Sequence, residues 1–172
     1  MDSAKRLSEM CEISPIVYPI GNSGQSIVFC NEAVAVFTEF QQKRFWMPEA
    51  GGQLFATFSS SRIEVRIATR PKLFDRRSRF GFVPSRAGEQ REIEHHFTRG
   101  LHFIGDWHTH PELTPRRSNL DIESMRECFR KSNHFLNAIV LVVVGKAIFP
   151  TGLEVSLHDS CNSYDLFASL KD

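Results

Sequence analysis

The sequence has little of what marks a membrane or nucleic-acid-binding protein. Its net charge is only +1, so no strong field draws it to nucleic acid or to an acidic membrane surface. Its longest strongly apolar run, residues 138–144, is too short to span a bilayer. Because the first residues contain neither a long apolar stretch nor a cleavage signal, we expect a cytoplasmic protein without membrane or nucleic-acid partners.

Cysteine is also scarce. The chain has four cysteines, and no two of them form a Cys-x-x-Cys pair. This spacing gives no support to a cysteine-based zinc knuckle, and disulfides are rare in the cytosol. We interpret the four as free thiols, which usually behave as small hydrophobic side chains: Cys11, Cys30, Cys128 and Cys161.

The sequence does contain enough apolar residues, 41% of 172, to bury one core, so we expect a single domain over residues 1–172. Apolar periodicity predicts strands over 13–20, 26–30, 53–58, 62–69, 101–107 and 137–144, followed by a hairpin through 158. Helical spacing and capping signals predict helices over 31–44, 88–100 and 118–131. We expect 70–86 to be irregular and 160–172 to be a short helix or a frayed tail. These elements predict an α/β or α+β layered domain.

Two histidines stand at the end of the strand predicted over 101–107. His108 and His110 are separated by one residue, so in an extended chain both side chains point to the same face. Two imidazoles placed in this way can reach one metal ion. Pro111 cannot continue a strand ladder, so we expect the strand to open into a loop there. Taken alone, a His-x-His pair is more often two unrelated histidines.

A second element of the pattern follows after six residues. Ser118 and Asp121 are three residues apart and therefore share one face of a helix. Asp121 can supply a third metal ligand, and two histidines with one carboxylate and a water form a hydrolytic zinc site. The same spacing predicts a capping box at the start of the helix, and Ser118 suits both interpretations. The combined pattern is much more specific than either half.

Other metalloenzymes and other candidate residues fit less well. A base deaminase would need His-x-Glu and Pro-Cys-x-x-Cys, which the chain lacks, and amidohydrolase barrels need ~250 residues. We expect His95 and His96 to face solvent, and Asp106 either to orient a ligand histidine or to be an ordinary strand residue. The arginine-rich segment 70–91 is a solvated loop, a groove for an extended or acidic substrate tail or, least favoured, a nucleic-acid contact.

The motif His108-Thr109-His110-Pro111 with Ser118 and Asp121 resembles that of the JAMM metallopeptidases, also called JAB1/MPN-plus domains. The resemblance covers residues 28–158. It implies a curved mixed sheet flanked by helices, similar to cytidine deaminases. It also implies one Zn²⁺ per chain and hydrolysis of peptide or isopeptide bonds after the tail of a ubiquitin-like protein.

The resemblance assigns two further roles. Glu49, in the segment Glu49–Leu54 before a strand, is similar to the family's general base, which transfers a proton from the attacking water to the leaving amine. Spacing alone could not select Glu49. Ser118 would stabilise the oxyanion of the tetrahedral intermediate, which is worth roughly 3–4 kcal/mol of barrier. Family members often carry Gly where this chain has Ala56, a small departure.

The segment Gly105–Glu112 is similar to that of a compact bacterial branch of the family. Those proteins accompany E1/E2-like conjugation proteins in antiphage (CBASS) operons. The resemblance implies a protein substrate with an extended C-terminal tail, namely a cyclic-oligonucleotide synthase (CD-NTase) conjugated to its targets. Two alternatives stay open: a non-catalytic MPN-type scaffold, and a peptidase that processes a sulfur-carrier or ubiquitin-like precursor.

Overall fold

The computed structural model describes residues 15–169, which form one mixed sheet of eight strands, a separate two-stranded hairpin and three helices. The order in the large sheet is β1-β2-β4-β3-β7-β8-β9-β10. Its strands are β1 (Ile16–Pro19), β2 (Ser26–Phe29), β3 (Gly51–Phe58), β4 (Arg62–Ala68), β7 (His102–Thr109), β8 (Ile139–Val144), β9 (Leu153–His158) and β10 (Ser163–Leu166). The hairpin is β5 (Arg76–Ser78) and β6 (Gly81–Val83), and the helices are α1 (Asn31–Phe40), α2 (Arg86–Phe97) and α3 (Asn119–Lys131).

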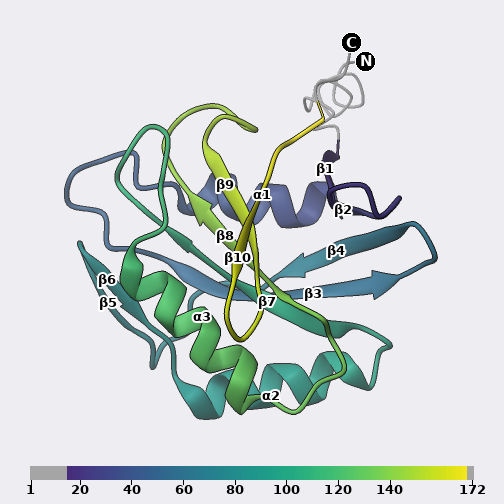
Figure 1. Ribbon diagram of the computed structural model, residues 1–172. Coiled ribbons are helices and arrows are strands. Elements are labelled where there is room, and N and C mark those ends of the chain that lie inside the picture. The colour runs from purple at the N-terminus through teal and green to yellow at the C-terminus, as the bar shows by residue number, and fades with distance from the viewer. Residues whose placement is uncertain (1–14, 170–172) are drawn as a thin grey trace, which may run out of the picture.

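The helices cover the two faces of the curved sheet, with α1 on one side and α2 and α3 on the other (Figure 1). The larger apolar cluster packs between the sheet and α1 and contains Trp107, whose indole N–H donates to the carbonyl of Thr69. A smaller cluster joins Met125 of α3 to the other face of β8. The sheet nearly closes, because the N–H of Ser169 donates to the carbonyl of Val17 on β1. Among residues 15–169, none of the helices has the length and apolar character needed to cross a membrane.

The strand β7 lies in the middle of the sheet, antiparallel to β3 and parallel to β8. All six residues of β8 are buried, as the continuous apolar run predicts. The pairing of β3 with β7 shifts register between Leu54 and Phe55, opposite Gly105. Gly105 has φ +151°, and a Cβ there would lie 1.8 Å from the carbonyl oxygen of Val140. Only glycine permits this close approach, so Gly105 determines how the rest of β7 faces the helices.

Most predicted elements are confirmed within a few residues, and the mixed α+β architecture agrees with the prediction. The first helix ends at Phe40 instead of residue 44, because Gln41 turns to an extended conformation and its amide donates to the carbonyl of Gly145. Cys30 and not Asn31 occupies its N-cap position. Residues 13 and 14 of the first predicted strand lie outside the described part of the chain.

Two segments differ from the prediction. Residues 76–83, expected to be irregular, form the hairpin β5–β6. Residues 163–166, expected to be helix or tail, form β10 against β9; residues 170–172 lie outside the described range. His96 is also buried and not solvent-facing: its imidazole lies 3.1 Å from the Glu92 carboxylate and against the Phe55 ring, whereas His95 is exposed as predicted.

Candidate metal centre

Strand alternation places His108 and His110 on one face of β7, toward α3. Thr109 between them is fully buried and points to the opposite face, where its hydroxyl accepts the N–H of Ala50. Its own N–H donates to the carbonyl of Ala50, so this residue holds the end of β7 against the chain entering β3. The N–H of His110 donates to Val144 at the end of β8. The two imidazoles therefore stand on backbone that is bonded on both sides.

The carboxylate of Asp121 comes from the first turn of α3. The predicted capping box is present: the N–H of Asp121 donates to the Ser118 hydroxyl over 3.2 Å, and the N–H of Ser118 donates to Asp121 Oδ2 over 2.6 Å. The hydroxyl of Ser118 also donates to Oδ2, over 2.8 Å. Oδ1 is left facing β7, so one carboxylate serves both the cap and the site.

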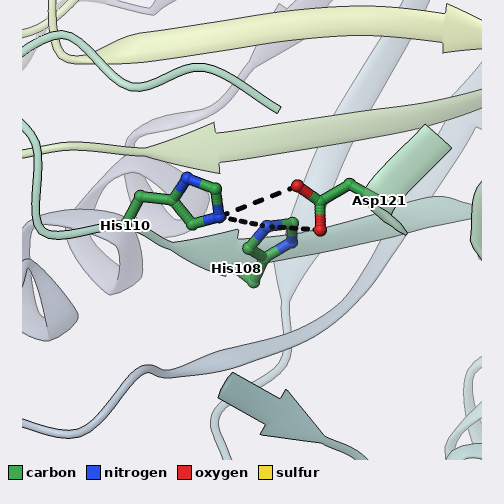
Figure 2. A group of neighbouring side chains, drawn as sticks. All are labelled: His108, His110 and Asp121. Atoms are coloured by element: carbon green, nitrogen blue, oxygen red, sulfur yellow. Dashed lines mark hydrogen bonds and ion pairs between the residues drawn. The ribbon is translucent and has the colours of Figure 1, made fainter. Parts of the chain in front are cut away.

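The three side chains converge on one point (Figure 2). The Nε2 atoms of His108 and His110 are 3.1 Å apart, and Asp121 Oδ1 and Oδ2 lie 3.4 Å and 3.7 Å from Nε2 of His108 and His110 respectively. At zinc–nitrogen distances of ~2.0–2.1 Å, the corners of a tetrahedron are about 3.3–3.4 Å apart. The side chains are 15%, 15% and 17% exposed, which leaves the site open on one side. The donor set and its geometry therefore fit a tetrahedral metal with a free position.

The electrostatics favour the ligand-competent forms of two of these groups. Burial and the neighbouring His108 lower the pKa of His110, which keeps its imidazole neutral at pH 7. Burial alone would raise the pKa of Asp121, but hydrogen bonds from His108 and Ser118 outweigh it and hold that pKa below its usual value. A neutral imidazole and an ionised carboxylate are the forms that bind a metal.

Glu49 lies beside this group, just before β3. In the antiparallel pair β3–β7, Gly51 lies opposite His108. Continuing this register by two residues places Glu49 opposite His110, so the Glu49 side chain points to the same face as the candidate ligands. Its side chain is buried, at 8% exposure. Burial raises the pKa of Glu49 to about 7. The charge of His108 opposes this shift, and the charges of Asp121 and Glu112 add to it. The family resemblance selected Glu49, and the structure brings it to the same face as the three candidate ligands.

Three residues that support the site were not identified from the sequence. Arg77 of β5 donates from Nε to the carbonyl of Glu49 over 2.7 Å, and Ser78 accepts the Glu49 N–H over 2.7 Å. The hairpin β5–β6 thus holds the Glu49 backbone, and the turn-forming Ser78-Arg79-Phe80-Gly81 was the available signal for it. Glu112 Oε2 lies 3.4 Å from Nδ1 of His110, so its carboxylate can orient that ring through the nitrogen opposite the site.

The structure does not support the suggested orienting role of Asp106. Its Oδ1 atom is buried and has no hydrogen-bond partner among residues 15–169. Burial, followed by the charge of Glu89, raises the pKa of Asp106 to about 7. Within residues 15–169, Oδ1 of Asp106 therefore makes no hydrogen bond that would orient an imidazole.

The fold and the site together define an α+β domain in which two histidines of a central strand and one helix-capping aspartate form a candidate metal centre. The model of the family described as prokaryotic homologs of the JAB domain matches residues 27–154, and the chain belongs to this family. The resemblance found in the sequence is thereby confirmed.

Two curated relatives carry the name "CD-NTase/cGAS isopeptidase". The one from Escherichia coli (strain TW11681) is 29% identical over 101 residues, which cover 57% of this chain and 65% of the relative. The one from Pseudomonas aeruginosa (strain BWHPSA011 / Pa011) is 27% identical over 104 residues, which cover 59% of this chain and 66% of the relative. The matches thus span just under two thirds of the length of these relatives.

One solved structure shares the fold. The solution structure of protein DSY2949 from Desulfitobacterium hafniense gives a TM-score of 0.58 at 15% sequence identity, covering 81% of this chain and 88% of that chain. At this identity the likeness concerns the fold alone. It agrees with the family match and with the curved sheet flanked by helices.

Proposed function

We propose that this chain is a zinc-dependent isopeptidase, with one Zn²⁺ held by His108, His110 and Asp121. The observation that carries the proposal is the convergence of these three side chains at tetrahedral spacing beside the buried Glu49. When bound there, zinc supplies Lewis acidity, which acidifies water and polarises a scissile carbonyl. We propose further that residues 1–172 form a single metallopeptidase domain.

In this proposal Glu49 is the general base and acid. Its carboxylate accepts a proton from the attacking water and delivers it to the nitrogen of the leaving amine. Burial raises the pKa of the Glu49 carboxyl, which favours its accepting a proton, and a zinc ion bound nearby would favour its giving the proton up again. The carbonyl of Glu49 is held by Arg77, so the side chain starts from a fixed backbone.

Ser118 has the proposed role of stabilising the oxyanion. Its hydroxyl donates to Asp121 Oδ2 at 2.8 Å in the structure, so an oxyanion must compete for that proton. An electron-rich oxyanion is the better acceptor once Asp121 shares its charge with a metal. Loss of one such donor lowers kcat by about 10²–10³-fold.

The substrate that we propose is a conjugated CD-NTase, released from its targets by cleavage after its C-terminal tail. The names of the two curated relatives, which identify them as CD-NTase/cGAS isopeptidases, support this substrate class. The same chemistry would serve a sulfur-carrier or ubiquitin-like precursor, and a chain without metal would be a scaffold. The cytoplasmic location expected from the sequence stays a prediction.

The test combines metal analysis with cleavage assays on purified protein. We expect about one zinc per chain, and cleavage of a CD-NTase conjugate by the wild type but not by Glu49→Gln. Glu123→Gln, at an exposed glutamate of α3, is the matched control and should cleave like the wild type. Less than half an equivalent of zinc would favour the scaffold, and equal cleavage by Glu49→Gln would remove Glu49 from the mechanism. If the enzyme cleaved only an unconjugated precursor, its substrate would be a sulfur-carrier or ubiquitin-like precursor instead of a conjugate.

A further inference from the structure

The loop between β7 and α3 determines whether Asp121 meets the two histidines. Residues 111–118 leave the sheet after His110 and return to start α3 at Ser118. The first half of this loop is bound to the turn after β8, because Lys146 and Ala147 donate their N–H groups to the carbonyls of Glu112 and Leu113. Its second half, which leads directly into the helix, needs a separate anchor.

That anchor is a single carboxylate on β9. The two oxygens of Glu154 accept, respectively, the backbone N–H of Arg117 and its guanidinium Nη1. The same Nη1 lies 2.6 Å from Oδ1 of Asp165 on β10. The side chains of Arg117 and Glu154 are only 14% and 21% exposed, whereas that of Asp165 is 55% exposed. Glu154 is therefore the sheltered partner that fixes both the backbone and the side chain of Arg117.

The sheet register places this anchor in line with the candidate metal centre. His108 pairs with Val143 on β8, and Val143 pairs with Glu154 on β9. Residues directly opposite one another in a sheet point to the same face, so His108 and Glu154 both face α3. Two strand spacings separate them, roughly 9–10 Å, which is too far for Glu154 to be a ligand. It can act only through the chain that it holds.

Arg117 immediately precedes the N-cap residue Ser118, and Asp121 follows one turn later. A helix start held at this point has a defined position and direction relative to β7. The capping box alone orients Asp121 within α3 but does not place α3 against the sheet. Metal sites tolerate errors of only ~0.2 Å in ligand distance, so the placement of the helix matters.

We propose that Glu154 is a positioning residue for the candidate metal centre: by holding Arg117, it places Asp121 and Ser118 against His108 and His110. This inference rests on the zinc site of the proposed function and deepens it. The local charge of the ion-pair cluster is not the cause in this proposal. The cause is the two-point hold of the Glu154 carboxylate on Arg117, with one oxygen on its backbone N–H and the other on its guanidinium, so that loss of either bond loosens the start of α3.

The test is Glu154→Gln in the full chain, measured by zinc competition with a chromophoric chelator and by the visible spectrum of the Co²⁺-loaded protein. Glutamine keeps one oxygen for the N–H of Arg117 but gives up the second oxygen and the charge. We expect zinc affinity to fall at least about tenfold, the effect known for outer-shell changes, together with a changed Co²⁺ spectrum. Asp165→Asn is the matched control, because it alters only the exposed partner of Arg117, and should keep both readouts.

Wild-type affinity and spectrum in Glu154→Gln would overturn the proposal, as would an equal loss in Asp165→Asn. If Glu154→Gln does not fold, Arg117→Ala carries the test: a clear loss of zinc affinity supports the proposal, and wild-type affinity overturns it. A wild type that binds zinc tightly but cleaves no conjugate would contradict the proposed function while leaving this inference standing. A wild type that binds no zinc would overturn both.

Discussion

Replacing Gly105 by alanine should damage both the fold and the candidate metal centre. Gly105 has φ +151°, and its Cβ would lie 1.8 Å from the carbonyl oxygen and 2.6 Å from the backbone nitrogen of Val140. Both atoms belong to the backbone of the buried strand β8, so no side chain can move aside. The clash must be relieved by separating β7 from β8 or by changing the bulge at Gly105.

The expected loss combines two costs. An L-residue in this backbone region costs about 1–3 kcal/mol, and forced overpacking of a core costs about 1–3 kcal/mol more. We therefore expect Gly105→Ala to lower the free energy of unfolding by about 2–6 kcal/mol, a large share of the ~5–15 kcal/mol typical of a domain. Because a shift of one residue turns a strand's side chains to the other face, His108 and His110 would also lose their orientation.

Urea unfolding followed by circular dichroism, together with zinc competition, measures both effects. Gly100→Ala is the matched control, since Gly100 has φ +74° but nothing within 4 Å of its added Cβ. It should lose only the conformational cost of about 1–2 kcal/mol and keep its zinc affinity. Equal losses in the two variants would refute the proposed packing of β7 on β8.

Four other predictions concern the site and the core. Asp121→Asn should abolish tight zinc binding, and retained zinc in this variant would contradict the ligand assignment. Ser118→Ala should keep zinc and cleave more slowly, and the loss of the helix cap should lower its free energy of unfolding by about 1 kcal/mol. Glu49→Gln should keep zinc and cleave at least ~100-fold more slowly, as measured by initial rates on one conjugate. Chelation should lower the thermal midpoint of the wild type but not that of Asp121→Asn, because a ligand of the native state alone stabilises it. Burial, followed by the charge of Arg117, lowers the pKa of His158 to about 4 in the folded protein, whereas the pKa of an unfolded histidine is ~6.5. Between these two pH values the unfolded chain binds one more proton than the folded protein, so the free energy of unfolding falls as the pH falls. In urea titrations at pH 7.5 and 4.5, the wild type should lose about 2–3 kcal/mol more than His158→Gln, and equal losses would refute the linkage.

The candidate ligands could be proposed from the sequence because local periodicity alone governs the faces on which they lie. His108 and His110 share a face in any extended chain, and Ser118 with Asp121 reproduces a local capping pattern. The continuous run of apolar residues in β8 likewise predicts a strand that is buried on both faces. Each of these signals lies within a few residues and needs no knowledge of distant contacts.

The missed features depend on partners far along the chain. The hairpin β5–β6 is short and mostly exposed, so apolar periodicity gives it no signal, yet it holds Glu49 from 28 residues away through Arg77. The strand β10 is recognisable only through its pairing with β9. His96 looks solvent-facing within its polar helix, but Phe55 of β3 covers it. The secondary structure and burial of such residues are determined by tertiary packing, which overrides local preference.

The same division runs through the candidate site. The ligand types can be read locally, but their meeting point requires α3 to start at one place above β7, and the sequence around Asp121 carries no such information. The structure assigns that placement to contacts with β8 and β9, and among these Glu154 acts on the residue directly before the helix. A mutation on β9, two strands from the ligands, should therefore change metal affinity more than many substitutions nearer to them. A site of this kind is specified by its supporting residues as much as by its ligands.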